Sequence, residues 1–133
     1  ISGPIVDRVD LWVEVSRIDP HKLSDNKSKG ESTENIKKRI LKAREIQKKR
    51  FKKNGLKINL NSNLSAKELL RVVDLSEPAK QILNQSAERL DFSPRVYHRI
   101  IKLARTIADL EEVETILSNH ILEAVQYRPK KVV

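Results

Sequence analysis

Residues 93–111, SPRVYHRIIKLARTIADLE, decide the fold class of this chain. Ser93 is a favourable helix cap, and Pro94 suits the first helical position because an amide there would have no partner within the helix. Apolar residues then recur at three- and four-residue spacing, at Tyr97, Ile100, Ile101, Ala104, Ile107 and Ala108. Four basic residues lie mostly off that stripe: Arg95, Arg99, Lys102 and Arg105. The segment therefore predicts an amphipathic helix that buries one face in a helical bundle.

Further helices are expected on both sides of this one. Ser65 and Glu68 form a capping-box pattern that opens a short helix, and Ser76 opens the next helix, with Pro78 in its first turn. Ser118 is expected to cap a last helix. Aromatic residues make up only 4% of the chain, which favours a core of aliphatic side chains packed helix on helix. We therefore predict a mainly α fold, with a C-terminal helical bundle over residues 65–128 and a tail at 129–133.

A long basic helix is predicted over residues 33–54, followed by a loop at 55–64. Ser32 or Thr33 caps its start, and Asn54 with Gly55 forms a stop signal. Residues 33–53 hold ten lysines and arginines against two glutamates, a net charge of +8, and the whole chain carries +9. Clustered cations attract phosphate backbones, although the same cations could simply form a solvated face. The candidate nucleic-acid contacts are Lys37, Lys38, Lys42, Lys48, Lys49, Lys52 and Lys53.

The N-terminal segment contains an alternating pattern that is typical of a β-strand. Val9, Leu11, Val13 and Val15 alternate with polar or amphipathic residues. A single strand cannot satisfy its own backbone groups, so we expect it to belong to a sheet built by other residues. We therefore interpret the chain as part of a longer protein, with residues 1–20 poorly ordered in isolation and residues 21–32 as a linker.

Several classes of site are excluded or disfavoured by composition. The chain has no cysteine, and its three histidines, His21, His98 and His120, lack metal-like spacing, so no metal site is expected. It has no glycine-rich phosphate loop with which to grip a nucleotide alone. It also has no apolar run long enough to span a bilayer, so we expect no membrane contact and a cytoplasmic location.

Two arginines have neighbours that suit an anionic ligand. Arg8 stands between two aspartates just before the predicted strand, and Arg95 lies at a helix N-terminus beside free amides and the positive end of the helix dipole. The alternatives are a surface ion pair for Arg8 and an ordinary exposed side chain for Arg95.

The two patterns and their order resemble a known family. The carrying stretches are residues 2–15 (SGPIVDRVDLWVEV), residues 93–111 and residues 124–128 (AVQYR). The chain resembles the C-terminal part of the ComM-like, magnesium-chelatase-related AAA+ ATPases. It is more distantly similar to the chelatase I subunit and to MCM helicases. The fold that this implies is a helical AAA+ lid bundle, preceded by one strand left over from the ATPase core and by the long basic helix.

The resemblance also implies roles for individual residues. Arg8 matches the arginine finger that reaches the nucleotide of a neighbouring subunit, with Asp7 orienting it, and Arg95 matches the sensor-2 arginine of the lid. A guanidinium donates a rigid fork of hydrogen bonds to the charge that spreads over phosphate oxygens during transfer. ATP and Mg²⁺ would bind the full-length protein, and no ligand is expected on this chain alone.

Two classes of function follow. In the first, the chain is a lid that is not an enzyme by itself. It completes an ATP site with its own missing core and with neighbouring subunits of a ring, usually a hexamer, which acts on DNA in branch migration or in a helicase-like way. The same lid could instead serve a magnesium-chelatase-type ATPase. In the second class, residues 33–53 form a non-catalytic nucleic-acid-binding module.

Overall fold

The chain is mainly helical, as predicted. The computed structural model describes residues 3–24 and 30–129, so parts of the predicted linker (25–29) and tail (130–133) and the first two residues lie outside it. Its elements are α1 (Gly3–Arg8), α2 (Pro20–Leu23), α3 (Thr33–Lys53), η1 (Asn61–Asn63), α4 (Ala66–Val72), α5 (Glu77–Leu90), α6 (Pro94–Leu110) and α7 (Ser118–Gln126). Within these residues, the β pairing consists of an isolated parallel bridge between Leu75 and Ile116. The short helices α1 and α2 were not predicted, and the domain boundaries given above stay predictions.

Serine side chains cap the starts of four helices, and Asp19 caps the short α2 by accepting a hydrogen bond from the His21 amide. The hydroxyls of Ser32, Ser65, Ser76 and Ser93 accept the amides of Asn35, Glu68, Ala79 and Val96. Glu68 completes the predicted capping box by accepting the Ser65 amide at 2.9 Å. Ser118, by contrast, is the first residue of α7 and not its cap, because the helix is capped from Leu117, whose amide donates to Nδ1 of His120 at 2.9 Å.

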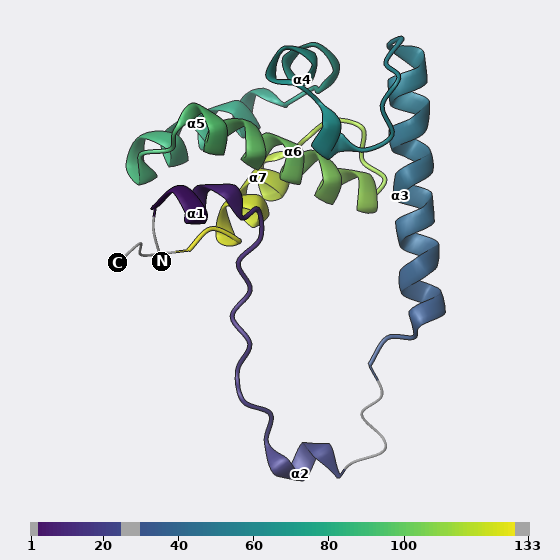
Figure 1. The fold of residues 1–133 in the computed structure, drawn as a ribbon, viewed down its shortest axis with the longest axis vertical. Helices are drawn as coiled ribbons and strands as arrows, with labels where there is room; N and C mark the ends of the chain where they lie inside the picture. Colours follow the sequence, from purple (N-terminus) through teal and green to yellow (C-terminus); the bar gives the residue numbers. More distant parts are fainter. Residues whose placement is uncertain (1–2, 25–29, 130–133) are drawn as a thin grey trace.

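The core is centred on α6, which contacts α3, α4, α7 and η1, while α5 packs on α7 (Figure 1). The largest fully buried apolar side chains are Phe51, Leu69, Leu83, Ile100, Ile116 and Ile121. Phe51 near the end of α3 belongs to this core, and its packing places the C-terminal part of α3 against the bundle.

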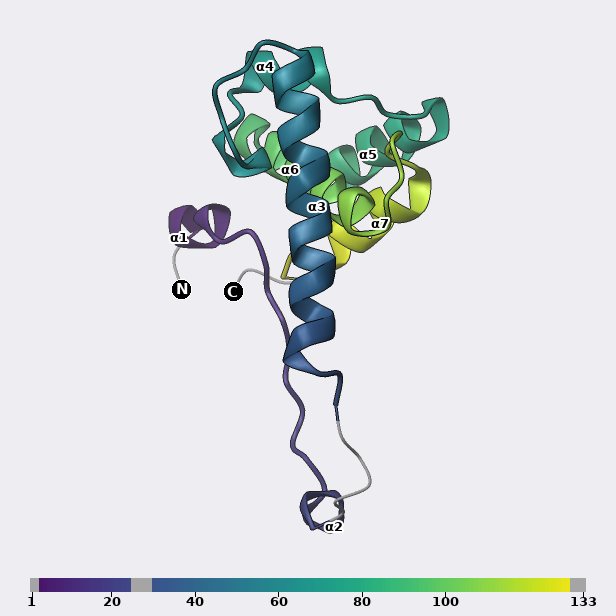
Figure 2. The same cartoon turned by 90° about the vertical axis from the view of Figure 1, so that its right-hand side faces the viewer.

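The N-terminal half of α3 lies beyond the bundle. Both views show the helix extending past α6 and α7 toward the end of the molecule where α2 lies (Figures 1 and 2). All residues from Thr33 to Lys42 are exposed, and the buried residues of α3 are Ala43, Gln47 and Phe51. The apolar side chains of Ile36 and Ile40 in this half remain about 40% exposed, because nothing in the described chain packs over it.

The predicted strand at residues 9–15 is wrong for this chain. The segment is irregular, and most of its apolar residues are exposed, including Val13 and Val15. It makes one backbone–backbone hydrogen bond with the bundle, from the Trp12 amide to the Tyr127 carbonyl oxygen at 2.8 Å. A strand requires a neighbouring strand to pair with, and the described residues provide none.

No helix in the described ranges is long and apolar enough to cross a membrane.

Candidate functional site

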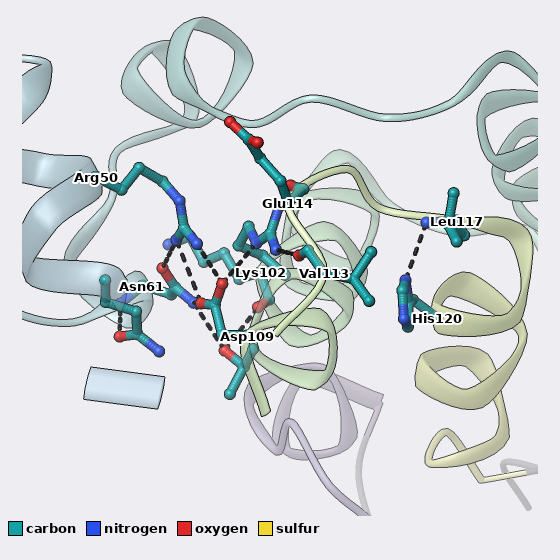
Figure 3. Close-up of polar contacts among 11 residues, drawn as sticks. Arg50, Asn61, Lys102, Asp109, Val113, Glu114, Leu117 and His120 are labelled. Atoms are coloured by element: carbon teal, nitrogen blue, oxygen red, sulfur yellow. Dashed lines mark hydrogen bonds and ion pairs between the residues drawn. The ribbon is translucent and has the colours of Figure 1, made fainter. Parts of the chain in front are cut away.

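The clearest side-chain cluster in the molecule is a buried polar network around Asp109. The Asp109 carboxylate has no exposed surface and binds the guanidinium of Arg50 on α3 through two hydrogen bonds (Figure 3). Asn61 of η1 donates to the same carboxylate at 3.0 Å and accepts from Arg50 at 3.1 Å. The Asn61 side chain also donates to Thr106 at 3.0 Å. One carboxylate therefore ties α3, η1 and α6 together.

Arg105 joins this network from one helical turn before Asp109. Its Nε donates to Asp109 at 3.0 Å, and its two terminal nitrogens donate to the backbone carbonyls of Val113 and Glu114. Burial lowers the pKa of the Arg105 guanidinium, and the charge of Asp109 opposes that shift. The prediction that Arg105 lies off the buried stripe is wrong, because its side chain is almost fully buried. Its four-residue spacing from Asp109 was the available signal for an ion pair.

The network is structural and not catalytic. Asp109 and Arg105 are buried, Arg50 is largely enclosed, and all three are paired with one another, while Arg105 also binds the loop after α6. The sequence ARTIADL at residues 104–110 therefore holds the bundle together. Arg50 and Asn61 had no sequence signal, since their partners are 59 and 48 residues away.

Arg8 lies at the end of α1 with an exposed side chain. Its backbone is held from α6, because Arg99 donates to the Arg8 carbonyl oxygen and pairs with Asp10 at 2.8 Å. The carboxylate of Asp7 lies 3.5 Å from the guanidinium of Arg128, and Arg128 also donates to the Val9 carbonyl oxygen at 3.0 Å. In the described chain, Asp7 is thus paired with Arg128, and the guanidinium of Arg8 has no ion-pair partner.

Arg95 is exposed in the first turn of α6, after Pro94. It is one turn before Arg99, so the two side chains leave the same face of the helix. Among the residues that the structure describes, Arg95 also has no ion-pair partner. The structure therefore places both predicted nucleotide-site arginines on the surface, and Arg99, on the same helix as Arg95, contacts the backbone of Arg8.

The candidate lysines of α3 are exposed along the length of the helix. Lys42 forms an ion pair with Glu112 at 2.7 Å. The other six, Lys37, Lys38, Lys48, Lys49, Lys52 and Lys53, have no ion-pair partner within residues 3–24 and 30–129. Their charge is therefore available to a polyanion.

His120 is explained by packing. It is buried, its Nδ1 accepts the Leu117 amide, and its Nε2 lies 2.7 Å from the Glu111 carboxylate. The described part of the chain has no group of three or more histidine, cysteine, aspartate or glutamate side chains that could hold a metal.

Comparison with known proteins identifies relatives over nearly the whole chain. The family described as "Magnesium chelatase, subunit ChlI C-terminal" matches residues 30–128. The chain is 37% identical to "Competence protein ComM" of Haemophilus influenzae over 128 residues, which is 96% of this chain and 24% of that protein. It is 39% identical to "Uncharacterized protein YifB" of Salmonella typhimurium over 128 residues, which is again 96% of this chain and 24% of that protein. The chain thus spans about a quarter of the length of these curated relatives.

Proposed function

The chain belongs to the family of magnesium chelatase subunit ChlI C-terminal domains, and from that premise we propose that it is the lid segment of an AAA+ ATPase. In this proposal Arg8 is an arginine finger and Arg95 is the sensor-2 residue. Both act at an ATP–Mg²⁺ site whose phosphate-binding loop and metal ligands belong to residues that this chain does not contain. The complete site forms between neighbouring subunits of a ring.

One observation supports this assignment most directly. Arg8 and Arg95 are exposed and carry no ion pair in the described chain, whereas nearby Arg99 and Arg128 are engaged by the residues around Arg8. An unpaired guanidinium on a fixed backbone suits a γ-phosphate, because it does not have to break an existing ion pair before it binds. Arg95 also lies near the positive end of the α6 dipole.

The test is the substitution Arg95→Ala in the full-length protein, with Arg89→Ala as a matched control. Arg89 is an exposed arginine in the last turn of α5, outside the proposed site. We expect Arg95→Ala to lower the maximal rate of ATP hydrolysis and to leave DNA affinity nearly unchanged. Wild-type turnover in Arg95→Ala would overturn the sensor-2 assignment.

We further propose that the ring acts on DNA, in branch migration or a helicase-like reaction, and that α3 contributes to DNA binding. This proposal is supported by the exposed, unpaired lysines of α3 and by the similarity to a protein whose name links it to competence. The resemblance to a chelatase subunit domain keeps a chelatase-type target as the competing proposal.

The proposed contribution of α3 to DNA binding is tested by neutralising Lys48, Lys49, Lys52 and Lys53 in the full-length protein. If α3 binds a phosphate backbone, duplex DNA binding weakens and its salt dependence becomes shallower, by about 0.9 in log–log slope for each phosphate that the protein no longer neutralises. ATP turnover without DNA stays at its wild-type value. An unchanged affinity and slope would mean that the lysines form a solvated face.

A further inference from the structure

Two arginines outside the proposed ATP site form hydrogen bonds and ion pairs with the segment that carries Arg8. Arg99 of α6 donates through Nη1 to the carbonyl oxygen of Arg8, and the same nitrogen lies 2.8 Å from the Asp10 carboxylate. It thus contacts the backbone of Arg8 itself and the side chain two residues later. A guanidinium has several donors in one plane, so a single side chain can hold two acceptors at once.

Arg128, just after α7, contacts the same segment at two neighbouring residues. Its Nη1 donates to the Val9 carbonyl oxygen at 3.0 Å, and its Nη2 lies 3.5 Å from the Asp7 carboxylate. One residue earlier, the Tyr127 carbonyl oxygen accepts the Trp12 amide at 2.8 Å. Residues 7–12 are therefore attached to the bundle at several successive points, by partners about 90 to 120 positions away in sequence.

Residues 7–12, which these contacts hold, have little regular secondary structure. Helix α1 ends at Arg8, and the residues that follow are irregular. Val6 is buried, but the side chain of Arg8 and most of residues 10–20 are exposed. The direction in which Arg8 leaves the surface thus depends on how its backbone is held, and Arg99 and Arg128 supply side-chain contacts that hold it.

We propose that Arg99 and Arg128 are positioning residues that fix Arg8 relative to the lid helix α6, and so relative to Arg95. This inference rests on the proposed function of Arg8 and adds a coupling to it. Because Arg95 and Arg99 lie one turn apart on α6, a movement of the lid carries both proposed ATP-contacting arginines together. We call the contacts of Arg99 and Arg128 with residues 7–10 the clamp. Asp7 and Asp10 are its carboxylate partners, so Asp7 orients Arg8 by fixing the backbone next to it.

The experiment is a double-mutant cycle between Arg8 and Arg99 in the full-length protein. ATP hydrolysis is measured at saturating ATP and across an ATP titration, with Arg89→Ala as the control. Slow variants are followed by single-turnover hydrolysis of radiolabelled ATP, and ring assembly is checked by light scattering. The side chain of Arg99 is 30% exposed, so its truncation leaves no closed cavity in the bundle.

We expect Arg99→Ala to lower kcat by about 10- to 100-fold, the scale of loss when a catalytic group is misplaced by about 1 Å. The KM for ATP and the assembly state should stay at their wild-type values. In the Arg8→Ala background, Arg99→Ala should cause no further loss, because its effect passes through Arg8. Arg128→Ala should behave in the same way.

Each contrary result has its own meaning. If Arg8→Ala leaves turnover at the wild-type rate, the proposed function of Arg8 fails and the clamp fails with it. If Arg8→Ala lowers kcat but Arg99→Ala does not, the clamp alone is overturned. The clamp is also overturned if Arg99→Ala lowers turnover by the same factor with and without Arg8, since Arg99 would then act independently.

Discussion

Arg50 of α3 and Asp109 of α6 form a two-pronged ion pair across 59 residues of sequence, and its carboxylate is closed off from solvent. This pair attaches the long basic helix to the bundle, and Arg105 and Asn61 complete its hydrogen bonds. The position of the α3 cations, several of which lie next to Arg50 in the last turns of the helix, therefore depends on this pair.

Removing this carboxylate should strongly destabilise the fold. We expect Asp109→Ala to lower the free energy of unfolding by about 3–5 kcal/mol, because Arg105 and Arg50 would keep their charges in a buried site without a counter-ion. Urea unfolding followed by circular dichroism measures the change. The matched control is Glu112→Ala, which breaks the exposed pair with Lys42 and should cost about 1 kcal/mol or less. Equal costs for the two variants would contradict the account of the network.

The two halves of α3 should respond differently to truncation of an apolar side chain. Phe51→Ala removes a fully buried ring and should cost about 3–5 kcal/mol. Ile40→Ala, in the half that lies beyond the bundle, should cost about 1 kcal/mol or less because its side chain is already partly hydrated. The same unfolding assay compares them. A large cost for Ile40→Ala would mean that the N-terminal half of α3 is packed in solution.

Helix caps offer a test at single hydroxyl groups. Ser93→Ala removes the acceptor for the Val96 amide at the start of α6 and should cost about 1 kcal/mol. Ser118→Ala should cost distinctly less, since α7 is capped from Leu117 through His120. Thermal unfolding of the two variants measures both losses of stability. A larger loss of stability for Ser118→Ala would restore the sequence-based prediction that Ser118 is the cap.

The capping box of α4 should make a pH-dependent contribution to stability. The backbone hydrogen bond from Ser65 lowers the pKa of Glu68 below its ordinary value of 4.5. A lowered pKa in the folded state means that the contribution is present above that ordinary value and is lost as the pH falls through the folded-state pKa. Glu68→Gln should therefore be less stable than the wild type at neutral pH, and the difference should vanish on acidification. A difference that is independent of pH would contradict this explanation.

Local sequence signals predicted the helices well because their causes are local. Serine caps, the capping box and the three-to-four periodicity of residues 97–108 act within one or two turns, and the helices they predict are present. The strand at residues 9–15 failed for the opposite reason. Its alternating pattern is real, but a strand forms only with a partner, and the described chain does not provide one.

The candidate site was predictable only in part. The identities of Arg8 and Arg95 came from local motifs and family resemblance, and their exposure agrees with the proposed roles without testing them. The clamp and the Asp109 network could not be predicted, because Arg99, Arg128 and Arg50 contact residues that become neighbours only in the folded chain. The sequence shows the charge of a basic residue, but its hydrogen-bond or ion-pair partner depends on the tertiary fold.

The most direct test of the central claim is the steady-state rate of ATP hydrolysis by the full-length protein carrying Arg8→Ala, with Arg17→Ala as an exposed-arginine control. If Arg8 is the finger of a neighbouring ATP site, kcat falls by about 10³-fold or more, the scale seen where arginine fingers are best defined, while the control retains full activity. Wild-type kcat in an assembled Arg8→Ala ring would contradict the account.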